Sequence, residues 1–167
     1  MAILKLTDIC KDYVQGKEPV RVLKNVNLTM ERGDYLAIMG PSGSGKSTCA
    51  RLAARLWDIS KGVIRVGGVD ISTIDPEVLL RDYSMVFQDV VLFDDTVMEN
   101  IRLGKRGATD EEVRAAAKAA NCDEFVHRLP QGYNTPIGEN GAKLSGGERQ
   151  RISIARALLK DAPIVLL

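Results

Sequence analysis

Gly40-Pro41-Ser42-Gly43-Ser44-Gly45-Lys46-Ser47 is the stretch of this 167-residue chain that decides its fold. It matches the pattern G-x-x-x-x-G-K-[ST] at every fixed position. Glycines let a backbone turn tightly enough for successive N–H groups to point inward at an anion. The lysine of such a loop neutralises the β- and γ-phosphates of a nucleotide, and the serine hydroxyl binds Mg²⁺. We therefore predict a nucleotide-binding loop that runs from Gly40 through Thr48.

The residues on either side of the loop support this interpretation. Tyr35–Met39 is a short apolar run of the kind that forms a buried strand. Residues 47–57 are expected to form a helix with Leu52, Ala53 and Leu56 on one face. A strand, a glycine loop and a helix N-terminus together form an arrangement in which the helix dipole adds to phosphate affinity. A chance glycine-rich turn is the alternative, and it would not require these flanks.

A second motif, Leu144-Ser145-Gly146-Gly147-Glu148-Arg149-Gln150-Arg151, resembles the signature of ATP-binding cassette (ABC) ATPases without any departure. The resemblance implies a second anion site, formed by Ser145 and the N–H groups of Gly146 and Gly147. These residues would begin a helix from about Glu148 to Lys160 that points at the γ-phosphate held by another ATP-binding domain. The implied partner is thus a second such domain, identical or different, with two ATP molecules between them. The alternative is an ordinary serine N-cap preceded by a loop.

Three weaker matches are read through the same resemblance. Gln88 resembles the glutamine that contacts Mg²⁺ and the attacking water, although it is also a generic residue after the expected strand 84–88. Tyr13 lies where the family stacks an aromatic ring on adenine; a tyrosine packed on the core is the alternative. The segment 135–141 resembles the loop by which exporters contact the coupling helices of their transmembrane domains, and is otherwise a Pro/Gly loop.

The expected fold is α/β: a P-loop NTPase core with a parallel sheet, an N-terminal antiparallel β portion and a helical subdomain. The chain is expected to divide into 1–88 for the core with the phosphate loop, 89–147 for the helical subdomain, and 148–167 for the signature helix and the last strand. Asp75-Pro76-Glu77 should begin a helix, and Thr109 with Glu112 should form a capping box before an alanine-rich helix at 113–120. The remaining strands are expected at 3–9, 26–30, 63–66 and 164–167.

Composition limits the remaining classes of function. Twenty-three basic and 22 acidic residues give a formal net charge of +1, with no basic cluster for nucleic acid. No apolar run is long enough to cross a membrane and no signal peptide is recognised, so we expect a cytoplasmic domain that reaches the membrane through transmembrane partner domains. Cys10, Cys49 and Cys122 are expected to be reduced, and His127 to be a surface residue without a chemical role.

The last residues, Ile164-Val165-Leu166-Leu167, match the apolar strand that precedes an Asp-Glu pair in ABC ATPases. In the family the Asp holds Mg²⁺ through water and the Glu polarises the attacking water. We therefore expect a domain truncated before these carboxylates, with its C-terminal part missing, which binds ATP and does not hydrolyse it. The alternatives are a catalytically inactive nucleotide-binding fragment and a DNA-repair or chromosome-maintenance ABC ATPase. The latter is disfavoured because no coiled coil separates the two motifs.

Overall fold

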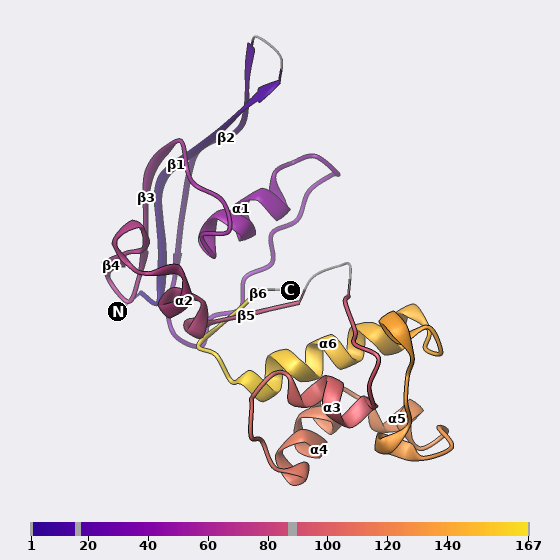
Figure 1. Cartoon of the computed structure of the whole chain (residues 1–167). Helices are drawn as coiled ribbons and strands as arrows, with labels where there is room; N and C mark the ends of the chain where they lie inside the picture. Colours follow the sequence, from indigo (N-terminus) through magenta and orange to yellow (C-terminus); the bar gives the residue numbers. More distant parts are fainter. Residues whose placement is uncertain (1, 16–17, 87–89, 167) are drawn as a thin grey trace. The chain divides into compact units, whose positions relative to one another are not determined.

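The computed structural model describes residues 2–15, 18–86 and 90–166 (Figure 1). The chain forms two compact units, Met1–Asp82 and Tyr83–Leu167. Each unit carries one of the two motifs, so each is described by itself.

The first unit is built on a four-stranded antiparallel sheet. Its strands are β1 (Leu4–Gln15), β2 (Glu18–Met30), β3 (Lys61–Val66) and β4 (Val69–Asp70), in the order β2-β1-β3-β4. Apolar side chains alternate into the core of this unit, and the buried ones include Leu4, Leu6, Leu23, Ile64 and Val66. The antiparallel β portion expected at the N-terminus is confirmed.

The β1–β2 hairpin is longer than expected, because bulges let polar residues join it. The expected strands were 3–9 and 26–30, whereas the pairing continues to Gln15 and Glu18 through three shifts of register. At one bulge the Asp8 N–H donates to the Asn27 side-chain oxygen at 2.9 Å, and the Asn27 amide donates back to the Asp8 carboxylate at 2.9 Å. Side-chain bonds thus replace the ladder bonds that a bulge removes.

Helix α1 (Lys46–Ala53) comes directly after the glycine loop and is shorter than expected. Arg55 has a left-handed backbone with φ of 52°, which ends the helix before Trp57. Leu52 and Ala53 are buried as expected, but Leu56 is 39% exposed and lies outside the buried face.

The helix α2 (Pro76–Leu79) begins as expected, with Asp75 accepting a hydrogen bond from the Glu77 N–H. Two short 3₁₀ turns, η1 (Ile71–Thr73) and η2 (Leu80–Asp82), complete the unit.

The prediction of a buried strand at Tyr35–Met39 is wrong in this structure. These residues have no assigned strand or helix and all five are exposed. An apolar run becomes a strand only when its N–H and C=O groups pair with a neighbour. No strand of the described part of the first unit pairs with it.

The second unit combines a two-stranded parallel sheet with a helical core. Strands β5 (Tyr83–Met85) and β6 (Ile164–Leu166) pair in parallel. The strand expected at 84–88 begins one residue earlier and ends at Met85, and residues 87, 88 and 167 of the two expected strands lie outside the described ranges. Ile164 is buried but Val165 is 45% exposed, so β6 is not buried along its length. The helices are α3 (Val97–Arg102), α4 (Asp110–Ala119), α5 (Asp123–Val126) and α6 (Gly146–Lys160), with 3₁₀ turns η3 (Gly132–Asn134) and η4 (Glu139–Gly141).

A continuous apolar core joins these helices. Val97 and Ile101 of α3, Val113 of α4 and Ile152 of α6 are fully buried in it. The expected capping box at the start of α4 is present, with the Thr109 hydroxyl and the Glu112 carboxylate each accepting from the other's backbone N–H. Of the helices in the described part of the chain, none is long and apolar enough to span a membrane.

A buried network of hydrogen bonds links α6 to α3 and to residues 91–93. The Asn100 amide is fully buried and all its bonding capacity is used, by Phe93, Thr96 and Arg156. Arg156 also donates to the Asn100 carbonyl at 2.6 Å and to the Val91 carbonyl at 2.7 Å. A satisfied network of this kind holds its members in one arrangement, so residues 91–93 are fixed to the helical core.

Candidate nucleotide-binding site

The glycine loop closes around the ammonium group of Lys46. This group donates to the Gly40 carbonyl at 2.5 Å, the Pro41 carbonyl at 2.9 Å and the Ser44 hydroxyl at 3.4 Å. Gly43 and Gly45 have φ of 81° and 88°, which only glycine adopts without strain, and these two turns let the loop curl. The positive charge is thereby held inside the curve of the loop, where a phosphate would be bound.

The N-terminus of α1 faces the same loop without a side-chain cap. Its N-cap residue is Gly45, which has no side chain to accept from the first N–H groups. Uncapped N–H groups and the helix dipole together favour an anion. Ser42 and Ser47 are exposed and Thr48 is half-buried.

The loop offers a hydroxyl, rather than a cage of carboxylates, to a metal ion. Within the described ranges, no group of three or more His, Cys, Asp or Glu side chains could hold a metal. The exposed Ser47 hydroxyl fits Mg²⁺, which takes oxygen ligands and usually binds through one or two protein groups together with substrate phosphates. Gln88, the second expected metal contact, lies outside the described residues.

Tyr13 lies on the strand pair that borders the loop. Lys11 of β1 pairs with Leu23 of β2, and a Cβ added to Gly45 would come within 2.7 Å of the Leu23 side chain. The half-buried Tyr13 is two residues along β1 from this contact. Tyr13 therefore lies on the same strand pair as Leu23, the residue whose side chain borders Gly45.

Trp57 is a neighbour of Tyr13 that the sequence did not single out. The two ring centroids lie 5.8 Å apart with an interplanar angle of 84°, so the rings meet edge to face. The Arg51 guanidinium lies 4.6 Å from the centre of the Trp57 ring. The only available signal was an aromatic residue at the end of the helix after the loop.

The signature forms an exposed helix start in the second unit. Ser145 caps α6 in a reciprocal capping box: its hydroxyl accepts from the Glu148 N–H at 3.4 Å, and Glu148 accepts from the Ser145 N–H at 2.8 Å. Helix α6 begins at Gly146, two residues before the expected start. Ser145, Gly146 and Gly147 are all exposed.

Among the described residues of the second unit, nothing requires the two signature glycines. Neither has a positive φ, a Cβ on Gly147 would meet no atom within 4 Å, and one on Gly146 would meet only Arg149 at 4.0 Å. Glycine weakens a helix relative to alanine. Its use at both positions therefore fits a close approach from outside the unit.

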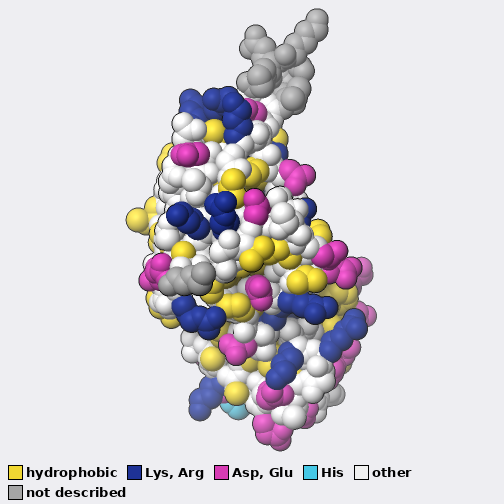
Figure 2. Space-filling model, turned by 90° about the vertical axis from the view of Figure 1, so that its left-hand side faces the viewer, with side chains coloured by type: hydrophobic (Ala, Val, Ile, Leu, Met, Phe, Trp, Pro, Cys, Tyr) yellow, Lys and Arg dark blue, Asp and Glu magenta, His cyan; other side chains and the backbone are white. Residues whose placement is uncertain are grey.

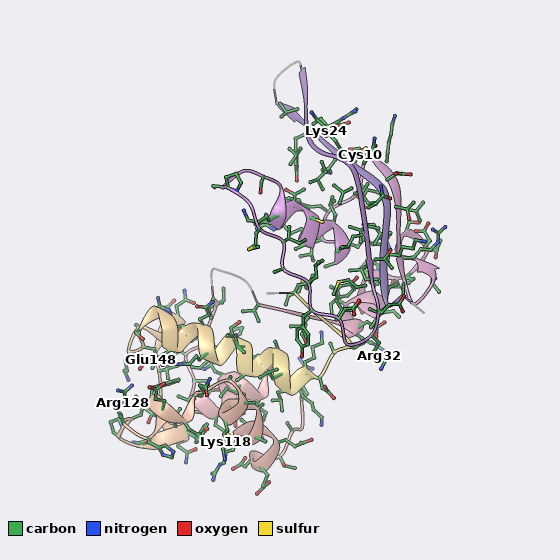
Figure 3. The ribbon with its side chains drawn as sticks, turned by 180° about the vertical axis from the view of Figure 1, so that it is seen from behind. Cys10, Lys24, Arg32, Lys118, Arg128 and Glu148 are labelled. Atoms are coloured by element: carbon green, nitrogen blue, oxygen red, sulfur yellow. The ribbon has the colours of Figure 1, made fainter. Side chains whose placement is uncertain are left out.

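Hydrogen bonds within the capping box favour the ionised form of Glu148. The pKa of Glu148 is lowered, chiefly by the hydrogen bond from the Ser145 N–H, with contributions from the Ser145 hydroxyl and the Arg128 and Arg151 charges. Figure 3 shows Arg128 near Glu148 at the start of α6, and their charged atoms are 4.0 Å apart. An ionised carboxylate at this position also suits the positive end of the helix dipole.

Two other stretches considered in the sequence, the segment 135–141 and His127, lie in the second unit. The segment 135–141 is tied to residues 95–96 by the Thr96–Pro136 bridge and by the Ile137 N–H donating to the Asp95 carbonyl at 3.0 Å. His127 is exposed at the end of α5, as expected. Figure 2 shows acidic and basic side chains interspersed over the face it presents.

All three cysteines are free and buried in this structure. Burial raises the pKa of the Cys49 thiol. The position of Cys49 near a helix N-terminus therefore does not lower its pKa.

Comparisons with known proteins agree with both motifs. A family model described as ABC transporter matches residues 23–167. A protein of Desulfotalea psychrophila called ATP-dependent lipid A-core flippase is 50% identical over 147 residues, which is 88% of this chain and 26% of that protein. A putative multidrug export ATP-binding/permease protein of Staphylococcus aureus is 49% identical over 155 residues, 93% of this chain and 26% of that protein.

A solved structure gives the same result. A bacterial Atm1-family ABC exporter with ATP bound matches with a TM-score of 0.89 and 43% identity, over 97% of this chain and 28% of that one. The chain spans about a quarter of the length of these relatives. A P-loop, a capped glycine-led helix with the ABC signature, and a family match over most of the sequence agree with one another. The chain therefore belongs to the ABC transporter family, as an ATP-binding domain of the exporter-like kind.

Proposed function

We propose that this domain binds MgATP at the loop 40–48 and works as the energy-coupling part of an ABC exporter. The observation that carries the proposal is the Lys46 ammonium, held inside a curled glycine loop at an uncapped helix start. ATP would supply the phosphates and bring Mg²⁺. Lys46 and the loop N–H groups would bind the phosphates, Ser47 and Gln88 would hold the metal, and Tyr13 would stack on adenine.

In this proposal the second anion site acts on another domain. Ser145, Gly146 and Gly147 would contact the γ-phosphate held by a second ATP-binding domain, identical or different, so that two domains enclose two ATP molecules. The exposed helix start with two glycines that the unit itself does not need supports this role. Residues 89–147 would form the helical subdomain, between the core and the signature helix.

The whole transporter would carry the domain at the cytoplasmic face of a membrane, through transmembrane domains. The names of the two relatives, a flippase and a permease, support this assignment. The chromosome-maintenance alternative has less support. Between the loop and the signature, the longest helix of the described residues is α4, with ten residues.

Calorimetry with Lys46→Ala tests the binding site. Removing the ammonium should weaken MgATP binding by about 1.5–3 kcal/mol, the worth of a charge-assisted hydrogen bond. Lys61→Ala, which removes a charge from β3 outside the loop, is the matched control and should bind like the parent. Equal affinity of the parent and Lys46→Ala would overturn the proposal.

A further inference from the structure

Trp57 is held against Tyr13 by contacts on both sides of it in the sequence. On its C-terminal side, Lys11 donates to the Asp58 carbonyl at 2.6 Å, the Asp12 N–H donates to the Ser60 hydroxyl at 2.9 Å, and the Ser60 N–H donates to the Cys10 carbonyl at 2.9 Å. The segment 58–60 is thus fastened to the three β1 residues that precede Tyr13.

On its N-terminal side, Trp57 is fixed to the end of α1. The Leu56 N–H donates to the Arg51 carbonyl at 2.9 Å, and the Arg51 guanidinium lies 4.6 Å from the centre of the Trp57 ring. A cation over an aromatic face is attracted by the ring quadrupole. The position of the indole is therefore set before any ligand arrives.

The indole meets the Tyr13 ring edge to face, which is a favoured geometry for aromatic pairs. A tyrosine side chain has several rotamers to choose among, and fixing one of them before binding removes an entropic cost from association. Trp57 shares this restraint with Lys11, whose ammonium lies 5.1 Å from the centre of the Tyr13 ring. Trp57 comes from the chain segment just beyond the helix that carries Lys46. Helix α1 thus has the phosphate loop at its start and the support of Tyr13 beyond its end.

We infer that Trp57 is a positioning residue for nucleobase binding: it holds the Tyr13 ring in the orientation that accepts the base, without touching the phosphates. The inference rests on the proposed function, and it goes further by separating the binding of the base from the binding of the phosphates. Loss of Trp57 should weaken the base-dependent part of nucleotide affinity and leave phosphate binding unchanged.

The test compares two probes, MgATP and magnesium tripolyphosphate, by calorimetry on the full 167-residue chain. Trp57→Leu keeps an apolar side chain and removes the ring. It should raise the Kd for MgATP about three- to tenfold, the range expected for an aromatic pair, and leave the Kd for tripolyphosphate within about twofold. Trp57→Phe keeps a ring and should restore most of the MgATP affinity.

Two further variants complete the design. Leu56→Ala changes the preceding residue, which has nearly the same exposure as Trp57 (39% against 37%), and should not alter either Kd. Tyr13→Ala should weaken MgATP binding, and Trp57→Leu should add no further loss in that background. Circular dichroism confirms that each variant is folded.

The outcomes separate the inference from the proposed function. If Trp57→Leu weakens both probes equally, or weakens MgATP as much without Tyr13 as with it, Trp57 does not act through Tyr13 and the inference is wrong. The inference is also wrong if Trp57→Leu binds MgATP like the parent while Tyr13→Ala does not. If the parent binds neither probe, or Lys46→Ala binds both unchanged, the proposed function fails instead.

Discussion

At the scale of single residues, glycines serve two different purposes in this chain. Gly45 has φ of 88°, and a Cβ there would meet the Leu23 side chain at 2.7 Å, so the fold itself requires glycine. Gly147 has neither constraint. The backbone conformation of the loop explains Gly45. The proposed contact with a γ-phosphate held by a second domain explains Gly147.

Alanine at these two positions should therefore have opposite effects on stability. Gly45→Ala should lower the free energy of unfolding by about 1–2 kcal/mol, the cost of a left-handed backbone for a residue with a Cβ. Gly147→Ala should raise it by about 0.5 kcal/mol, because alanine loses less chain entropy in a helix. Urea unfolding followed by circular dichroism measures both. Destabilisation by Gly147→Ala would show that the second unit itself needs this glycine.

Local chemistry made much of the site predictable. Three features depend only on residues within a few positions of one another: the loop around Lys46, the N-cap at Ser145 and the capping box at Thr109. Their structures could therefore be predicted from the local sequence. The Tyr13–Trp57 contact joins residues 44 positions apart, and the Asn100–Arg156 network joins residues 56 apart. Neither has a local signature. The strand expected at Tyr35–Met39 failed because apolar character does not supply a pairing partner.

At the scale of elements, two helices begin with the same device. Both α4 and α6 start with a reciprocal capping box, formed by Thr109 with Glu112 and by Ser145 with Glu148. They differ in the residues directly after the cap: α4 continues with acidic residues, whereas α6 continues with two exposed glycines. The start of α4 thus provides an internal control for the start of α6.

Ser145→Ala and Thr109→Ala should each cost about 1 kcal/mol of stability, the usual value of an N-cap. Only Ser145→Ala should also weaken the ATP-dependent pairing of two domains, since only this cap belongs to the proposed second anion site. Sedimentation with and without MgATP measures the pairing. Equal weakening by both substitutions would mean that the effect comes from helix stability alone.

The lowered pKa of Glu148 predicts a dependence of stability on pH. A carboxylate whose pKa is lower in the folded state than in the unfolded state stabilises the fold above its unfolded pKa, and this contribution is lost as the pH falls through the folded value. The free energy of unfolding should therefore fall as the pH drops below about 4.5, and fall less steeply in Glu148→Gln. Denaturant titrations across this range test it. Identical slopes for the parent and the variant would contradict the assignment.

At the scale of the whole molecule, the two units differ in how well their residues are buried. The helical core of the second unit buries a continuous set of side chains, whereas residues 31–40 of the first unit are exposed throughout. The glycine loop continues directly from this exposed segment. Exposed backbone without ladder hydrogen bonds opens at little cost in free energy. We therefore expect residues 31–40, which lead into the glycine loop, to open more readily than the rest of the first unit.

Hydrogen exchange should reveal this contrast. Amides of residues 35–39 should exchange fastest, and those of α3 and α6 slowest. MgATP should slow exchange in 40–48 of the parent but not of Lys46→Ala, because phosphates bound to the loop occupy its N–H groups. Protection by MgATP confined to α3 and α4 would be inconsistent with the proposed site.

The placement of Trp57 also makes the two units optically distinguishable. It is the only tryptophan of the chain and it belongs to the first unit, whereas α3 to α6 all belong to the second. Tryptophan emission during denaturation therefore reports on the sheet and the phosphate loop, while ellipticity in the helical band reports mainly on the signature-bearing unit. If the two signals change at one denaturant concentration, the units unfold cooperatively, and if they separate, each unit has a stability of its own.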